Sequence, residues 1–306
     1  MRIESCNLGC SGGAGGTQVS CGVVQIYVNT EIRVRFTQPV DPSSLSPSSF
    51  SLIDVNSGQV PAGSRFVDPA DPNTVVFRPA LSFDGIGGPV FGFGHNTTYR
   101  VMIPGASQGD SPPYVTSLGP PSLPNRTRML CTVIANLGIE TPAAAFCAGD
   151  GTDPAVSIPC PCNNQDTHGR GCDNSQPGSN GALFFALGAT SPDSVVLYAT
   201  YEPASSTALV MQSTQSVPSG IAFGDGIRCL GGRILRLGVQ SPASGVVAFP
   251  GPGDPSITAR SAALGDPIAP GSQRFYQTWY SDPDLAFCPN PPGDRFNATN
   301  AVSITW

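Results

Sequence analysis

Residues 31–36 are Glu-Ile-Arg-Val-Arg-Phe, and this short stretch decides the fold class. Ile32, Val34 and Phe36 alternate with charged residues. Successive side chains of a β-strand point to opposite faces of the sheet, so the alternation predicts a strand with one buried face and one solvated face. Apolar blocks of similar length recur along the chain and are separated by turn-forming residues. We therefore predict an all-β protein.

The first half of the chain has the strand spacing of a β-sandwich. Pro39 and Pro42 cannot donate to a ladder, and Asp41 and Ser43 favour a tight turn after the strand at residues 31–36. The proline-rich stretch 104–124 is longer than a usual connection, and we predict a surface loop or contact arm there. The predicted strands are residues 24–28, 31–36, 50–54, 74–78, 98–103 and 127–135.

The second half predicts another sandwich, of the jelly-roll kind. Residues 138–181 show little periodicity and carry four cysteines, which indicates a disulfide-pinned linker. We therefore expect an Ig-like domain over residues 1–138, and a Cys-rich linker with a second β-sandwich over 139–306. The strands predicted after the linker are residues 182–187, 194–201, 207–215, 220–223, 233–237, 246–249, 256–260, 274–280 and 301–306.

Composition and charge exclude several classes of protein. The 36 glycines and 32 prolines among 306 residues are about twice the usual share, and both residues disfavour helix. All fifteen basic residues are arginine and the net charge is −6, so the basic surface needed for nucleic acid or an anionic membrane is missing. The longest apolar run, residues 129–139, is shorter than the roughly 20 residues that span a bilayer.

The ten cysteines place the chain outside the reducing cytosol. We expect five disulfides, with four cysteines in the first domain, six in the second, and a bond from Cys229 to Cys288. The alternative is a zinc site at Cys160, Cys162, His168 and Cys172, although the spacing fits no standard finger. The N-terminus lacks the apolar core of a secretory signal, so we expect a leader to lie outside this chain. The ten are Cys6, Cys10, Cys21, Cys131, Cys147, Cys160, Cys162, Cys172, Cys229 and Cys288.

Two segments of the first half resemble the bacterial Ig-like domains of surface-layer and other exported proteins. They are residues 29–53, from Asn-Thr-Glu-Ile-Arg-Val-Arg-Phe to Phe-Ser-Leu-Ile, and residues 96–105, Asn-Thr-Thr-Tyr-Arg-Val-Met-Ile-Pro-Gly. Residues 223–232, 274–280 and 301–306 resemble an uncharacterised β domain that closes many exported bacterial proteins. The first resemblance implies an Ig-like fold, the second implies secretion, and neither implies an activity.

Few side chains suit catalysis. Gly9-Cys-Ser11-Gly-Gly13 has the letters of a nucleophile elbow, yet no strand, helix or histidine base accompanies it, so we interpret it as a chance match. We interpret His95 and His168 as ordinary loop residues. We predict no enzyme, no cofactor, no catalytic residue and no metal site.

Carboxylates gather in three turn-like pairs that could hold calcium, although none has the spacing of a defined calcium loop. Aspartate beside proline is also ordinary turn chemistry, and we favour turns. Asp282 and Asp284 could instead serve a hydrolase as paired carboxylates. The pairs are Asp68 with Asp71, Asp150 with Asp153, and Asp282 with Asp284.

An aromatic strand near the C-terminus is the candidate contact surface. Residues 275–280 place Phe275 and Trp279 on one face and Tyr276 and Tyr280 on the other, so one pair should fill the core. If the other pair is exposed, it offers a platform for sugar rings or for a partner protein. Trp306 ends a last strand that completes its own sheet or is lent to a neighbour. Tyr276, Trp279, Tyr280 and Trp306 are therefore the predicted ligand or partner contacts.

We predict a non-enzymatic structural protein of the cell surface or of an extracellular filament, which assembles with copies of itself or with other surface proteins. A carbohydrate-binding or adhesive module is the alternative. The sequence leaves open the partner, the oligomeric state, the disulfide connectivity and any glycan. Asn96, Asn125 and Asn297 begin triplets of the N-glycosylation type.

Overall fold

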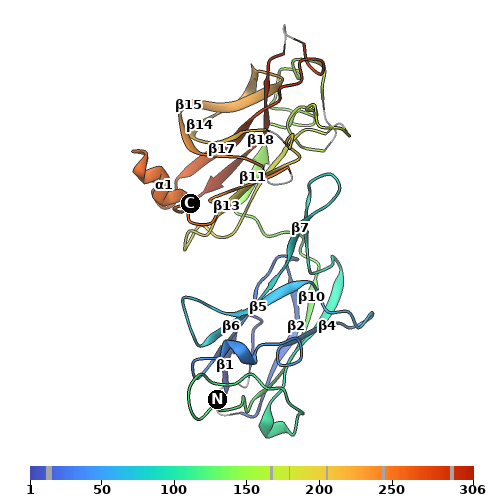
Figure 1. The fold of residues 1–306 in the computed structure, drawn as a ribbon, viewed down its shortest axis with the longest axis vertical. Coiled ribbons are helices and arrows are strands. Elements are labelled where there is room, and N and C mark those ends of the chain that lie inside the picture. Colours follow the sequence, from blue (N-terminus) through green and yellow to red (C-terminus); the bar gives the residue numbers. More distant parts are fainter. Residues whose placement is uncertain (12–15, 166–167, 179, 205, 243–244, 290–292) are drawn as a thin grey trace. The chain divides into compact units, whose positions relative to one another are not determined.

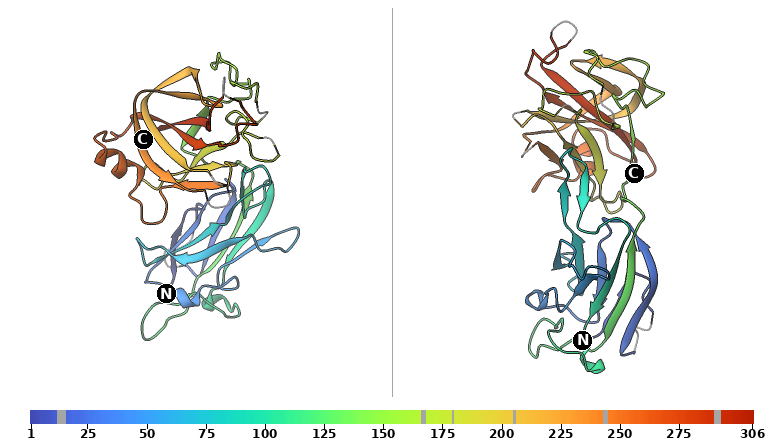
Figure 2. Two further views of the ribbon diagram at one scale, coloured as in Figure 1. Left: turned by 45° about the horizontal axis from the view of Figure 1, so that its top comes forward. Right: turned by 90° about the vertical axis from the view of Figure 1, so that its right-hand side faces the viewer.

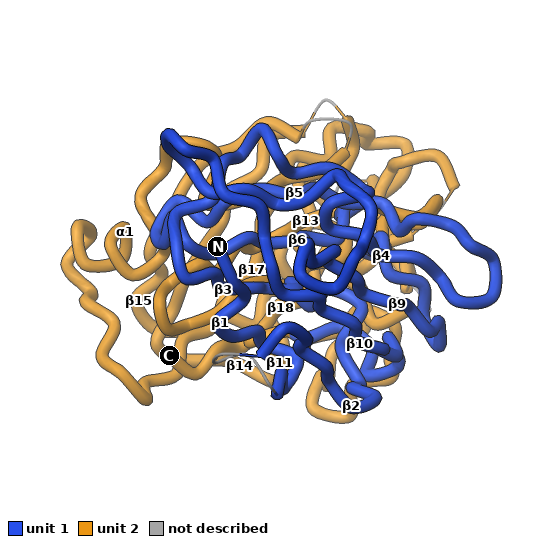
Figure 3. Tube along the Cα trace, turned by 90° about the horizontal axis from the view of Figure 1, so that it is seen from below, with its two compact units in different colours: residues 1–82, 89–140 blue, residues 83–88, 141–306 orange. Residues whose placement is uncertain are grey.

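The computed structural model describes residues 1–11, 16–165, 168–178, 180–204, 206–242, 245–289 and 293–306. They divide into two compact units (Figure 3), residues 1–82 with 89–140 and residues 83–88 with 141–306. Strands dominate both units, so the prediction of an all-β, disulfide-stapled fold is confirmed.

The first unit is a sandwich of two four-stranded sheets (Figure 1). One sheet has the order β1 (Ile3–Cys6), β3 (Ile32–Phe36), β6 (Thr74–Pro79), β5 (Gly63–Val67). The other has the order β2 (Gln18–Ile26), β10 (Arg128–Ala135), β9 (Thr97–Ile103), β4 (Ser51–Asp54). Only β2 and β10 pair in parallel, and one apolar core lies between the sheets. β7 (Leu81–Phe83) and β8 (Pro89–Phe91) form a separate hairpin.

The central strand β3 has the two faces that its sequence predicts. Ile32, Val34 and Phe36 are fully buried in the core. On the wet face Arg33 pairs with Asp68, and Arg35 Nε donates to Asp71 Oδ2 at 3.0 Å. The alternation therefore determines both the core and a band of ion pairs beside it.

The proline-rich stretch 104–124 is not simply a loose arm. Val115 within it is fully buried in the core of the first unit, and Ser117 forms a β-bridge with Val40. Leu118 is exposed. The periodicity that reveals a strand is missing from such a segment, because prolines leave it few donors for a ladder.

The second unit is also a sandwich. Its larger sheet has the order β11 (Ala143–Phe146), β18 (Phe296–Thr305), β17 (Gln273–Ser281), β14 (Ala208–Phe223), β15 (Gly226–Gln240). Its smaller sheet has the order β12 (Leu183–Leu187), β13 (Val196–Thr200), β16 (Val246–Phe249). Phe184, Leu197, Tyr276 and Tyr280 are among the buried residues that fill the space between them. β11 lies inside the stretch that we predicted as a linker.

β14 and β15 form a long, strongly curved hairpin (Figure 2). Their register shifts at three places, between Val210 and Met211, between Ser213 and Gln215, and between Ser216 and Ile221. Bulges bend a strand and increase its twist. The curved hairpin bends around the aromatic side chains of β17, and Phe223 of β14 contacts Trp279.

One predicted strand is wrong. Residues 256–260 begin a short helix, α1 (Ile257–Ala263), rather than a strand. The Ser256 side chain accepts a hydrogen bond from Ala259 N at 3.4 Å, which is an N-cap. Ile257 and Ser261 are buried four residues apart, which is the spacing of one helix face. A segment of seven residues is too short for this period to be recognised in the sequence.

All ten cysteines are paired, and no bond joins the two units. The predicted Cys229–Cys288 bond is wrong. Cys229 lies on β15 and pairs with Cys147 just after β11, whereas Cys288 lies in the loop after β17 and pairs with Cys162. The bonds are Cys6–Cys10, Cys21–Cys131, Cys147–Cys229, Cys160–Cys172 and Cys162–Cys288.

No helix in the described ranges has both the length and the apolar character that crossing a membrane requires.

The two disulfides of the first unit close loops of very different length, so their removal should have different costs. Cys21–Cys131 spans 110 residues and Cys6–Cys10 spans 4. In the chain-entropy model, loss of the longer link should lower the free energy of unfolding by roughly 2–3 kcal/mol more than loss of the shorter one. Urea unfolding of Cys21→Ala/Cys131→Ala, with Cys6→Ala/Cys10→Ala as the matched control, measures the difference. Equal losses of unfolding free energy in the two double variants would contradict this prediction.

Candidate functional site

The two faces of β17 have different environments. Tyr276 and Tyr280 point into the core and are fully buried. Phe275 and Trp279 lie on the opposite face, where they pack against Leu209, Met211 and Leu230. The outer face of the large sheet therefore carries a second apolar cluster, which we call the outer cluster.

The structure corrects the expected contact role of the two tyrosines. Tyr276 OH accepts a hydrogen bond from Trp306 Nε1 at 2.9 Å, and Tyr280 OH accepts one from Asn174 Nδ2 at 3.2 Å. Burial raises the pKa of Tyr280 well above its usual value, and the Asn174 hydrogen bond acts in the opposite direction. Both rings are enclosed, so neither can meet a ligand. Of the four predicted contact residues, Trp279 lines the pocket described next, and the other three do not.

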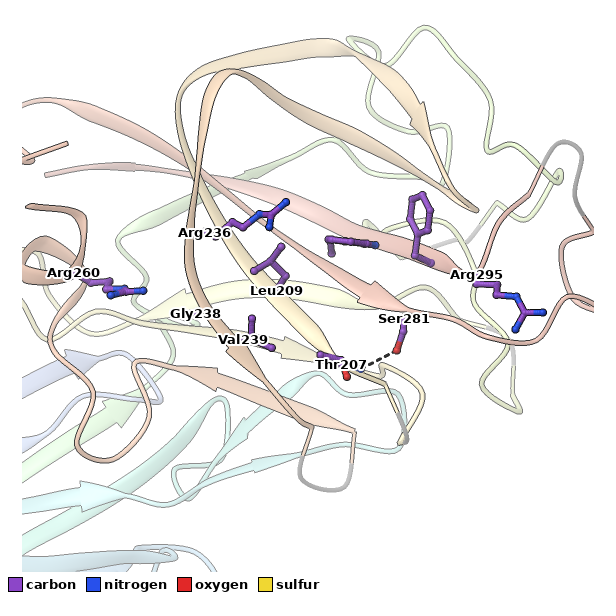
Figure 4. A pocket seen from close by; sticks show the side chains of 10 residues that line it. Thr207, Leu209, Arg236, Gly238, Val239, Arg260, Ser281 and Arg295 are labelled. Atoms are coloured by element: carbon purple, nitrogen blue, oxygen red, sulfur yellow. Dashed lines mark hydrogen bonds between the residues drawn. The ribbon is translucent and has the colours of Figure 1, made fainter. Parts of the chain in front are cut away.

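The pocket beside Trp279 has a volume of about 530 Å³, within the range of small-molecule sites. Its sides come from β14, β15, α1, β17 and the start of β18. Arg260 and Arg295 lie at opposite ends of the lining in the close-up, with Leu209 and Val239 between them (Figure 4). The lining residues are Thr207, Leu209, Arg236, Gly238, Val239, Arg260, Trp279, Ser281, Arg295 and Phe296.

Aromatic packing fixes the indole of Trp279. Its ring meets Phe296 edge-on at a centroid distance of 5.4 Å and Phe223 at 5.9 Å. Nε1 of the indole is buried and has no hydrogen-bond acceptor among the described residues. At the rim, the Ser281 hydroxyl accepts a hydrogen bond from Thr207 N at 2.8 Å. The pocket therefore combines a rigid aromatic wall with hydroxyl groups at its edge.

No pattern in the sequence indicates the other lining residues. Arg236 alternates with buried Leu235 and Leu237, which looks like the solvated face of an ordinary strand. Arg260 was assigned to a strand that is a helix, and Arg295 lies just before β18. Five segments far apart in sequence build the pocket, so no local spacing could have identified it.

Beside the outer cluster, buried polar groups fasten the strands. Gln277 Nε2 donates to Ile227 O at 2.8 Å and to Thr299 O at 2.7 Å, while its Oε1 accepts from Cys229 N at 3.1 Å. All of these groups lie next to the Cys147–Cys229 disulfide. This part of the sheet is structural and presents no open site.

The three aspartate pairs serve turns, as we favoured. Asp71 accepts from Asn73 N and Thr74 Oγ1, and Asp150 accepts from Thr152 N and Gly169 N. Asp284 is exposed and accepts from Ala286 N. Asp68 and Asp153 accept backbone N–H groups in the same manner.

Asp282 is fully buried, which removes the support for a hydrolase. Its carboxylate accepts hydrogen bonds from Ser175 N, at 3.0 Å, and from Ser175 Oγ. A carboxylate held in this way cannot reach a substrate together with exposed Asp284.

Two other buried carboxylates have raised pKa values. Burial raises the pKa of Glu202 to about 8, and the hydrogen bond from Ser206 Oγ offsets part of that rise. Burial raises the pKa of Asp225 to about 7, with smaller contributions from the nearby charges of Asp282 and Asp294 and an opposing one from the Asp294 N–H. Both groups lie within the fold of the second unit and lie outside the pocket lining.

The three cysteines of the alternative zinc site, Cys160, Cys162 and Cys172, all form disulfides. Cys160 bonds to Cys172, and Cys162 bonds to Cys288, so the two cysteines have different partners. His168 and His95 are both exposed. Among the described residues, the one group of three close metal-ligand atoms is Cys6, Cys10 and Cys21, all of which are disulfide-bonded. Gly12 and Gly13 of the Gly9–Gly13 motif lie outside the described residues.

The three glycosylation-type triplets differ in access. Asn96 is exposed in a turn with φ of 58°. Asn125 and Asn297 are fully buried, and their side-chain amides donate to backbone carbonyls, including Pro104 O at 2.9 Å and Asp173 O at 2.9 Å. On the folded protein, only Asn96 can accept a glycan.

No protein-family model matches the chain, and no curated protein matches it. The N-terminal part of the bacterial S-layer protein SbsC is similar over 65% of this chain and 40% of that chain, with 13% identity and a TM-score of 0.26. The S-layer protein rSbsC(31-844) is similar over 99% of this chain and 40% of that chain, with 12% identity and a TM-score of 0.27. The chain thus spans about 40% of the length of these solved chains. TM-scores this low carry no argument about function.

The buried Glu202 carboxyl should make stability depend on pH. Its folded-state pKa of about 8 lies above the value near 4.5 in an unfolded chain, so the folded state holds the proton more tightly. The free energy of unfolding should therefore fall as pH rises from about 4.5 to about 8. The loss should reach a few kcal/mol, because one pKa unit corresponds to about 1.4 kcal/mol.

Glu202→Gln should lose less free energy of unfolding between pH 5 and pH 8 than the native chain, and it should be the more stable of the two at pH 8. The control is Glu140→Gln, which removes the same charge from an exposed position. Urea unfolding at pH 5 and pH 8 measures all three proteins. If Glu202→Gln loses stability with pH as steeply as the native chain, this account of Glu202 is wrong.

Proposed function

We propose that the chain is a non-enzymatic structural protein that acts outside the cell, at a cell surface or in an extracellular filament. The observation that supports this most is the pairing of all ten cysteines within two all-β units. Paired cysteines in this number belong to oxidising compartments, where disulfides stabilise the folded state by restricting the unfolded chain. The likeness of the first half to bacterial Ig-like domains, and a division near residue 138, remain part of this proposal.

Assembly would use surfaces and sheet edges rather than exchange of the last strand. β18 lies inside its sheet and is hydrogen-bonded to β11 on one side and to β17 on the other. Lending it to a neighbour would break both ladders. The edge strands β5, β4 and β15 have an unpaired side in the described chain, which is the usual template for strand addition.

A carbohydrate-binding or adhesive module is the second candidate. β18 is paired on both sides within its own sheet, so it is not available for exchange between copies. This favours a binding module over assembly by strand exchange. The pocket beside Trp279 favours it as well, since its aromatic wall and its rim hydroxyls are the groups that hold sugars.

Electron microscopy of the purified protein over a range of concentrations tests the structural proposal. We expect ordered filaments or sheets to form as concentration rises under non-reducing conditions. Protein pretreated with dithiothreitol in mild denaturant should lose them, because each unit is then without its internal disulfides and is less stable. Dispersed monomers at every concentration would contradict the structural proposal and leave the binding module as the better candidate.

A further inference from the structure

Three arginines gather in the lining of the pocket beside Trp279. Five arginines elsewhere, Arg33, Arg35, Arg78, Arg128 and Arg274, pair with carboxylates. Arg236, Arg260 and Arg295 have no carboxylate within ion-pair distance among the described residues, and the pocket lining contains no acidic side chain. In a chain with a net charge of −6, this makes a local positive site.

One of these guanidinium groups is held in place by the fold. Arg260 Nε donates to the backbone carbonyl of Leu237 at 2.7 Å, which ties α1 to β15. The N–H groups of its two Nη atoms remain available for a ligand, and a guanidinium fork is suited to a planar carboxylate. Arg236 lies on the same strand as Leu237 and is exposed. The pocket therefore offers hydrogen-bond donors from one anchored guanidinium, Arg260, and from one exposed guanidinium, Arg236.

The rest of the lining is suited to a ring with both apolar and hydroxyl faces. Trp279 and Phe296 form an aromatic wall, and Val239 is an aliphatic side chain left 65% exposed. Thr207 and Ser281 bring hydroxyl groups to the rim. A simple inorganic anion would leave the aromatic wall unused, and a purely apolar ligand would leave three guanidinium groups without a partner.

We propose that this pocket binds an acidic oligosaccharide, whose uronate carboxylates meet Arg236 and Arg260 separately while a sugar ring lies against the aromatic wall. The site is independent of assembly, so it holds whether or not the protein forms filaments. Binding should weaken as ionic strength rises, because an exposed charge pair is screened by salt.

Tryptophan fluorescence can report binding directly, because the chain contains only Trp279 and Trp306. Trp306 lies at the chain end and donates to Tyr276 in the core, so Trp306→Phe leaves Trp279 as the single indole. This variant is titrated with tri-galacturonate and, separately, with the neutral maltotriose at the same ionic strength. We expect a saturable change in emission, with at least tenfold tighter binding of the acidic sugar.

Arginine variants in the same background locate the charge. Arg236→Ala changes an exposed side chain that makes no hydrogen bond or ion pair with the described residues, and it should weaken binding of tri-galacturonate at least tenfold. Addition of Arg260→Ala should weaken it further. Arg100→Ala removes an exposed arginine of the first unit and should have no effect. Circular dichroism and the melting temperature confirm that each variant is folded.

Any one of four results would overturn the proposal. Three of them are equal affinity for the neutral and the acidic sugar, unchanged affinity in Arg236→Ala, and competition by sodium sulfate as effective as by tri-galacturonate. The last would show a general anion site in which the sugar ring plays no part. Absence of any saturable signal would overturn it as well, and it would leave the structural proposal untouched.

Discussion

The second unit depends on disulfides that hold a long irregular segment against its large sheet. Between β11 and β12 the described residues contain turns, bends and a single bridge from Asp173 to Gly181. Ordering a backbone costs about 1–2 kcal/mol per residue, and this segment has little ladder hydrogen bonding to offset that cost. Cys147–Cys229 and Cys162–Cys288 bind it to β15 and to the loop after β17. The buried cysteines themselves form an apolar cluster with Ile227 and Ala301.

That covering explains why one face of a sheet can carry both a core-like region and an open site. The Cys-rich segment covers the face around Ile227, and the curved β14–β15 hairpin encloses the outer cluster. What stays uncovered is the end of the sheet beside Trp279, where α1 adds Arg260. On the opposite face of β17, Tyr276 and Tyr280 complete the sandwich core. β17 therefore contributes to the core of the unit with one face and to the pocket wall with the other.

Strand alternation and apolar blocks were enough to predict most of the fold, because burial on one face leaves a period of two in the sequence, as in β3. The failures have physical causes. α1 is too short to show a helical period, and Cys288 lies in a loop whose position depends on tertiary contacts. The aromatic strand was identified, but which of its faces is enclosed depends on what covers the sheet. Arg236 and Arg260 line one pocket only because the hairpin and α1 fold together, so the sequence could not reveal the charge in the pocket.

The central claim is that five specific disulfides, two within the first all-β unit and three within the second, stabilise the protein in an oxidising environment. Peptide mapping by mass spectrometry of the non-reduced protein tests it most directly. The account predicts cross-linked peptides for Cys6–Cys10, Cys21–Cys131, Cys147–Cys229, Cys160–Cys172 and Cys162–Cys288, with no free thiol. Free thiols at most positions, or a bound zinc ion in place of the links, would contradict it.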